Sequence, residues 1–134
     1  MKKMLKMAIF LGLGGLAMAA VSCSSEPAPT LTESAKDLAI SSIMGYDEVS
    51  GAEIKQDGRD LSLVVIVGCA TSEDVAKDLG DNFVRMVKSF GPESAPTGKD
   101  IGKGEFDYLV GVYCANENQI ALGAKNRSST HINW

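Results

Sequence analysis

The sequence predicts one α+β domain. It would be a two-layer sandwich with the element order α-β-β-α-β-β, in which two helices lie on one face of a four-stranded, mostly antiparallel sheet. Two segments repeat apolar residues at the three- and four-residue steps of a helix. Four segments are rich in β-branched residues or alternate with the period of two that strands show. Each helical segment precedes a pair of strand segments joined by a turn, which favours helices packed together on one sheet.

The first helix is expected to begin after Thr30 or Thr32, either of which can cap it, and to end near Gly45. Its apolar stripe consists of Leu31, Ala35, Leu38, Ala39 and Ile43. Residues 49–56 alternate weakly and predict a strand. Asp57-Gly58 then signals a hairpin turn, because glycine accepts the positive φ that such a turn requires.

Residues 61–69 are apolar on both faces after Ser62, which predicts the central strand, covered on at least part of both sides. The second helix is expected to begin at Thr71, which forms a capping-box pattern with Asp74, and to end at Gly91-Pro92. Its apolar stripe consists of Val75, Leu79, Phe83, Met86, Val87 and Phe90.

Residues 92–104 are polar and rich in glycine and proline, which predicts a mobile loop. Residues 106–115 predict a strand, and residues 119–125 pair back on it as a second hairpin. One face of the first of these strands carries Phe106, Tyr108, Val110, Val112 and Cys114. One face of the second carries Ile120, Leu122 and Ala124.

If the two hairpins meet through residues 61–69 and 106–115, these two strands run parallel, with the second helix as their right-handed crossover. Two alternatives are open for the polar residues 126–134. They form either a frayed tail or a docked edge held by Ile132 and Trp134.

The first 23 residues have the pattern of an export signal. Three lysines at positions 2, 3 and 6 precede an uncharged apolar run, Met7–Val21. A run of about 15 residues suits the core of a signal peptide but is shorter than the ~20 that cross a bilayer as a helix. Ala20-Val21-Ser22-Cys23 resembles the lipobox of bacterial lipoproteins, although Ala20 stands where that family usually has leucine.

The resemblance implies cleavage before Cys23, a thioether-linked diacylglycerol on its sulfur, and an acyl chain such as palmitate on the new amine. Two or more such chains anchor a protein stably, whereas one is marginal. The chain would divide into a signal peptide (1–22), the lipidated cysteine with a flexible tether (23–30), and the domain (31–134). The implied location is the cell envelope, facing the periplasm from the outer membrane in a Gram-negative source, because Ser24 follows the cysteine.

Two other fates of the N-terminus are open. Ala17-Met18-Ala19 also matches the A-x-A site of an ordinary signal peptidase, which would release a soluble secreted protein beginning at Ala20. The apolar run would otherwise stay uncleaved as an N-terminal anchor, a fate that its shortness disfavours.

The mature chain would be acidic. The full sequence has 13 Lys and Arg against 17 Asp and Glu. Residues 1–22 contain three lysines and no acidic residue, so their removal leaves ten basic residues and a net charge of −7. Such a surface repels nucleic acids and anionic head groups. We therefore expect no nucleic acid partner, and contact with the membrane only through the N-terminal lipid.

Cys69 and Cys114 would remain as an even pair once Cys23 is lipidated. An even pair in an exported protein is a candidate disulfide. It would close a loop of 45 residues (114 − 69). The alternative is two buried free cysteines that act as small apolar residues, since both lie in apolar strand patterns.

No segment groups the residues of a catalytic, metal or cofactor site, and we expect none of the three. His131 is the one histidine and lies in a Ser/Thr-rich tail. Residues 98–104 lack the spacing and the following Ser or Thr of a phosphate-binding loop. Acidic residues such as Asp57 and Asp60 lack the spacing of a calcium loop and indicate a solvated surface. The tyrosines at positions 46, 108 and 113 are either an exposed recognition patch or half-buried packing.

We therefore expect a non-enzymatic module that binds an envelope protein or supports an assembly. The alternative is a small-ligand-binding or enzymatic domain that uses a cleft beside residues 92–104. A shallow open sheet face would favour the first function, and a deep pocket with facing ionisable groups would favour the second.

Overall fold

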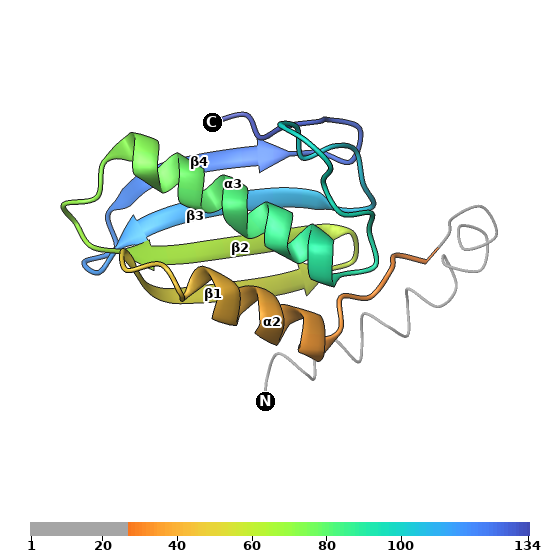
Figure 1. The fold of residues 1–134 in the computed structure, drawn as a ribbon, viewed down its shortest axis with the longest axis horizontal. Coiled ribbons are helices and arrows are strands. Elements are labelled where there is room, and N and C mark those ends of the chain that lie inside the picture. The colour runs from red at the N-terminus through yellow and green to blue at the C-terminus, as the bar shows by residue number, and fades with distance from the viewer. Residues whose placement is uncertain (1–26) are drawn as a thin grey trace, which may run out of the picture.

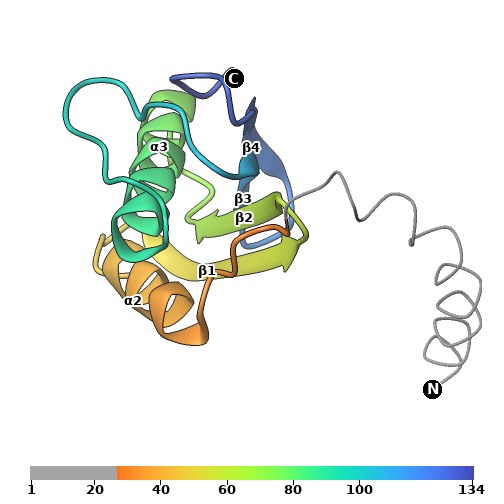
Figure 2. The same cartoon turned by 90° about the vertical axis from the view of Figure 1, so that its right-hand side faces the viewer.

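In the computed structural model, which describes residues 27–134, two helices lie against one face of a four-stranded sheet (Figures 1 and 2). The elements are α2 (Glu33–Ile43), β1 (Val49–Asp57), β2 (Asp60–Val67), α3 (Glu73–Phe90), β3 (Asp107–Cys114) and β4 (Gln119–Lys125). The predicted α+β class and element order are confirmed. The predicted signal peptide, its two alternative cleavage sites and Cys23 lie outside the described residues.

The sheet has the strand order β1-β2-β3-β4. The strands β2 and β3 pair in parallel, whereas β1–β2 and β3–β4 are antiparallel hairpins. The two hairpins thus meet through β2 and β3, which is the condition under which the sequence predicts a parallel centre, and α3 is the crossover between them. Gly58 in the first hairpin turn has a φ of 63°, which glycine adopts without strain.

The core lies between the helices and the sheet. Alternate residues of β2, from Leu61 to Val67, are buried, and the same holds for Tyr108 to Cys114 of β3. They pack with Phe83, Val84 and Val87 of α3 and with Ala39 and Ile43 of α2. Burying each large apolar side chain contributes roughly 1.5–3 kcal/mol relative to leaving it in water.

The helix starts follow the expected chemistry, with one correction. The side chain of Thr32 caps α2 by accepting a hydrogen bond from the main-chain N–H of Ala35 at 3.1 Å. The prediction of Thr71 as the start of α3 is wrong by one residue, because Ser72 is the cap. Thr71 instead closes the preceding turn, where its N–H donates to the carbonyl of Gly68.

Both helix stripes are narrower or rotated compared with the prediction. Leu38 is 48% exposed, because α2 contacts only α3 and the edge strand β1. In α3, Val75 and Phe90 lie at the exposed margin. Their predicted places in the core are taken by small residues and one valine that contact the neighbouring layer, namely Ala76, Gly80 and Val84.

The C-terminal tail is docked. Ile132 is 6% exposed, and Asn133 forms a β-bridge with Ala124 of β4. Trp134 lies over two glycines. A Cβ atom added at Gly80 would lie 2.5 Å from Trp134 Cη2, and one added at Gly123 would lie 2.6 Å from Trp134 Cε3. Of the two alternatives for the tail, the structure shows the docked edge.

We expect Gly80→Ala to displace Trp134 from this seat. The cost of overpacking, typically about 1–3 kcal/mol, exceeds the gain of about 1 kcal/mol from replacing a helical glycine by alanine. Trp134 is the only tryptophan, so its emission should shift to the red. The control is Gly98→Ala, because no heavy atom lies within 4 Å of a Cβ at that position. An unchanged emission spectrum in Gly80→Ala would contradict this packing.

Candidate functional site

No element of residues 27–134 covers the face of the sheet opposite the helices, and we call it the open face (Figure 2). Side chains alternate across a strand, so every second residue points to this side. Leu109 of β3 is 50% exposed and Leu122 of β4 is 43% exposed. Together with neighbouring partly buried residues they form the apolar field, which we define as Val64, Ile66, Leu109, Tyr113 and Leu122.

Gly111 lies in the middle of the apolar field, paired with Val64 on one side and Leu122 on the other. A Cβ atom at Gly111 would lie 2.6 Å from Cε1 of Tyr113. The ring of Tyr113 therefore lies across the strand instead of standing away from it. The result is a shallow apolar surface over which neither of the described helices, α2 and α3, lies.

The side of β4 that the sequence predicted to be apolar lies on the open face, except for Ile120. Leu122 and Ala124 are exposed, whereas Ala121, Gly123 and Lys125, which alternate with them, are buried. Ile120 is only partly buried and packs against the core, beside a register shift in the pairing of β3 with β4. The bulge thus splits the face that Ile120 was expected to share with the other two.

Three aspartates form a row across the open face at its hairpin end. The register places Asp57 of β1 opposite Asp60 of β2, and Asp60 opposite Asp107 of β3. We call these three residues the acidic row. Asp107 accepts a hydrogen bond from the main-chain N–H of Arg127 at 2.8 Å. Among the described residues, neither Asp57 nor Asp60 forms an ion pair.

The acidic row borders a surface hollow of about 430 Å³ on the open face. Its lining also includes Ser62, Leu109 and Ala124. Carboxylates thus lie at one end of the hollow and apolar side chains at the other. Within residues 27–134 no three potential ligands among His, Cys, Asp and Glu converge as a metal site would require.

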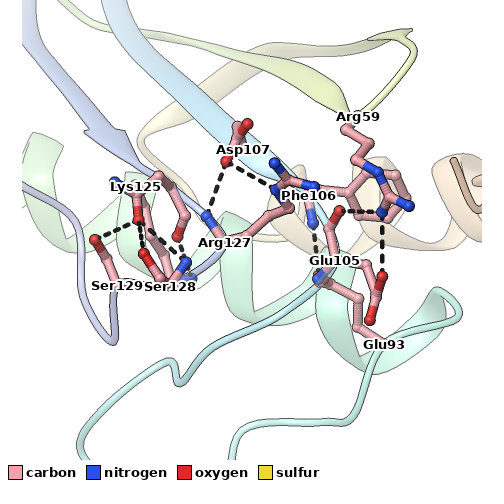
Figure 3. A network of polar contacts seen from close by, with 10 residues as sticks. Arg59, Glu93, Glu105, Phe106, Asp107, Lys125, Arg127, Ser128 and Ser129 are labelled. Carbon is pink, nitrogen blue, oxygen red and sulfur yellow. Dashed lines mark hydrogen bonds and ion pairs between the residues drawn. The ribbon is translucent and has the colours of Figure 1, made fainter. Parts of the chain in front are cut away.

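A second polar region lies under the loop of residues 92–104 (Figure 3). Lys88 and Lys125 are each 1% exposed. Lys88 Nζ donates to the carbonyls of Lys103 at 2.8 Å and Gly102 at 3.4 Å. Lys125 Nζ donates to the carbonyl of Asn126 at 3.3 Å. No sequence signal pointed to these two lysines, because the pattern of a strand or helix does not show which polar residues are buried.

Glu93 connects this region to the start of β3. Its carboxylate accepts hydrogen bonds from the main-chain N–H of Glu105, from that of Phe106 at 3.1 Å, and from the hydroxyl of Tyr108 at 2.7 Å. Burial, then the hydrogen bond to Glu93 and its charge, raise the pKa of Tyr108. Burial and the charge of Lys88 lower the pKa of Lys125, while Glu93 and Asp107 oppose that shift.

These hydrogen bonds attach residues 92–104, which the sequence predicted to be a mobile loop, to the rest of the domain. Besides Lys88 and Glu93, the guanidinium of Arg85 donates to the carbonyls of Gly98, at 2.9 Å, and Lys99. Main-chain N–H groups of the loop also donate to the C-terminal tail, from Gly102 to Thr130 and from Gly104 to Arg127. Side chains of α3 thus donate hydrogen bonds to carbonyl groups of the loop for which the sequence pattern predicts no partner.

A larger surface hollow, of about 740 Å³, lies between this loop and the tail. Two of the three basic side chains in its lining, those of Arg59 and Arg127, form ion pairs with acidic side chains of the same lining. Arg59 contacts Glu105 at 3.1 Å, and Arg127 contacts Asp107 at 3.7 Å (Figure 3). A charged ligand entering here would have to compete with these ion pairs.

Cys69 and Cys114 are joined in the structure, with their Cα atoms 4.8 Å apart. This separation suits a disulfide. Cys114 ends β3 and lies beside the end of β2, so the bridge lies at the end of the sheet opposite the acidic row.

We expect the double substitution Cys69→Ser/Cys114→Ser to lower the free energy of unfolding by about 2–4 kcal/mol, because it frees a 45-residue loop in the unfolded chain. Urea denaturation of both proteins measures the difference. A thiol count on the denatured, unreduced protein provides the independent check. Two reactive thiols from positions 69 and 114 would exclude the bridge.

The remaining sequence candidates are dispersed. Tyr108 is 2% exposed and faces the helices, and Tyr46 lies before β1, where its hydroxyl contacts Asn82. Only Tyr113 belongs to the open face. His131 is exposed, and its Nδ1 lies 3.3 Å from the hydroxyl of Thr130. No helix in the described part of the chain is long and apolar enough to cross a membrane.

No protein family, curated protein or solved structure matches this chain.

Proposed function

We propose that this chain is a lipid-anchored protein of the cell envelope, and that its α+β domain is a non-enzymatic binding or assembly module. The observation that carries the proposal is the open face of the sheet. Leu109 and Leu122 keep about half of their surface in water there. A solvated sheet face ordinarily carries polar residues, and an exposed apolar patch marks an interaction site.

The anchor in this proposal is the diacylglycerol and acyl modification of Cys23. The support is the lipobox-like Ala20-Val21-Ser22-Cys23 after a short apolar run and a basic start. Since two or three chains would enter one leaflet, attachment would be stable without any basic surface. This matters because the mature chain is acidic.

The position of residues 27–31 supports one orientation of the domain relative to such an anchor. Residues 27–31 lie along the end of the sheet. The carbonyl of Pro27 accepts a hydrogen bond from Arg59 in the β1–β2 turn at 3.5 Å, and that of Pro29 accepts one from Gln56 at 2.8 Å. Cys23 is four residues before Pro27, a reach of at most about 14 Å. The end with the acidic row would therefore be nearest the membrane.

The hollow of about 740 Å³ beside residues 92–104 supports a second candidate, a small-ligand-binding or enzymatic domain. Its volume falls in the range of ligand sites. We place it second because Arg59 and Arg127, two of its three basic side chains, are already paired with Glu105 and Asp107.

The intact mass of the protein purified from membranes tests the proposal. A polypeptide that begins at Cys23 and carries the added mass of diacylglycerol and acyl groups is the expected result. A polypeptide that begins at Ala20 would identify a soluble secreted protein, and one that retains Met1 would identify an uncleaved anchor. Either result would overturn the lipid anchor.

A further inference from the structure

We infer that the open face docks a segment of another protein that is basic at one end and apolar along the rest, with its basic end over the acidic row. The inference rests on the proposed function for the location of the partner in the envelope. It adds the chemistry of the partner and its direction on the sheet. The argument depends on three features of the described residues: the uncovered apolar field, the acidic row, and the position of Pro27.

The apolar field supplies the area on which such a segment would pack. Val64, Leu109 and Leu122 come from three neighbouring strands, and Gly111 between them leaves the surface shallow. A shallow face accommodates an extended strand or a helix and does not enclose a small molecule. The occupant is therefore a polypeptide surface.

The charged residues next to the apolar field determine which charge the partner should carry. Asp57 and Asp60 have no basic partner among the described residues, and Asp107 has one at 3.7 Å. The hollow beside them joins these carboxylates to Leu109 and Ala124. A lysine or arginine fits this arrangement, because its aliphatic stem packs on apolar side chains while its charged head reaches the carboxylates.

A second copy of this chain fits the open face less well. Two copies anchored in one leaflet would both direct their hairpin ends toward that membrane. If their open faces then packed together, the two acidic rows would meet across the interface. Like charges placed opposite each other cost several kcal/mol in an interface. An anionic membrane surface is disfavoured for the same reason.

A titration with two matched model peptides tests the inference. Both peptides carry the same alternating leucine and valine residues and a fluorescent label, and one ends in three lysines where the other ends in three glutamates. The protein is the mature full chain in phosphatidylcholine nanodiscs, and empty nanodiscs give the background. We expect the lysine peptide to bind at least about tenfold more tightly than the glutamate peptide at low salt, with the difference shrinking as salt rises.

Variants locate the binding. Asp57→Asn/Asp60→Asn should weaken the lysine peptide about fivefold, and Leu122→Glu should weaken both peptides. The matched control is Asp37→Asn/Asp78→Asn, which removes the same charge from exposed positions on the two helices. It should change the affinity less than about twofold. Equal losses in the two double variants would reduce the effect to net charge and overturn the inference.

Two further outcomes also overturn it. If both peptides bound equally, or neither bound, the inference that the partner has a basic end would be wrong. A dimer in sedimentation that Leu122→Glu dissolves would assign the face to a second copy. Neither outcome depends on lipid, because the same titration applies to soluble protein if Cys23 proves unmodified. If the peptide titration fails while Cys23 proves to be lipidated, only the inferred chemistry of the partner is withdrawn.

Discussion

Replacing Cys23 with serine should move the protein from the membrane fraction to the soluble fraction. Serine has no thiol on which the thioether can form, so the chain would lose its diacylglycerol and its processing as a lipoprotein. Each buried CH₂ contributes about 0.8 kcal/mol to membrane attachment, and two or three acyl chains hold a protein stably. The expected effect on partitioning is therefore close to complete.

Fractionation followed by detection of the chain measures this effect. Cys69→Ser is the matched control, since it removes a cysteine from the same polypeptide and should leave the protein in the membrane fraction. A wash at high salt separates the lipid from electrostatic attachment, because surface charges are screened within a few ångströms at 1 M salt. A Cys23→Ser protein that sediments with membranes as the parent does would contradict the anchor.

Replacing Glu93 with alanine should lower the free energy of unfolding by about 3 kcal/mol or more. The substitution removes the acceptor of two main-chain N–H groups and of the Tyr108 hydroxyl. It also removes a negative charge that favours the charged form of the buried Lys125. Hydrogen bonds to a charged group contribute about 1.5–3 kcal/mol each, and an uncompensated buried charge adds to the loss.

Thermal unfolding should show this as a decrease in Tm of roughly 12–20 °C for a domain of this size. Glu105→Gln is the control. Glu105 is the neighbouring carboxylate, but its side chain is 59% exposed, and such a surface ion pair, here with Arg59, contributes at most about 1 kcal/mol. If the two variants lost the same small amount of stability, Glu93 would not be the centre of this polar region.

The sequence predicted the elements well because their signals are local. The hairpin turn at Asp57-Gly58 depends on the positive φ of one glycine, and the start of α2 depends on one capping hydroxyl, that of Thr32. The alternation in β3 depends on neighbouring residues alone. The errors at Leu38 and Val75 arose because periodicity identifies an apolar stripe but not how much of it a neighbouring layer covers.

Only part of the candidate site could be predicted from the sequence. The hairpin turn alone places Asp57 opposite Asp60, so that pair was predictable from local information. Asp107 joins them through the parallel pairing of β2 with β3, which spans 47 residues and has no turn to fix its register. The burial of Lys88 and Lys125 likewise depends on a loop and a tail that come from elsewhere in the chain.

The sequence by itself determined the α+β class and the order of the elements, because both depend on residue patterns and on short connections. It also contains the pattern of an export signal and the cysteine on which the anchor is proposed. Only the tertiary structure decided that residues 27–134 leave one face of the sheet uncovered and that three aspartates align beside its apolar field. The physical reason is that strand register and layer coverage arise from contacts between residues far apart in the chain, and no local pattern encodes them.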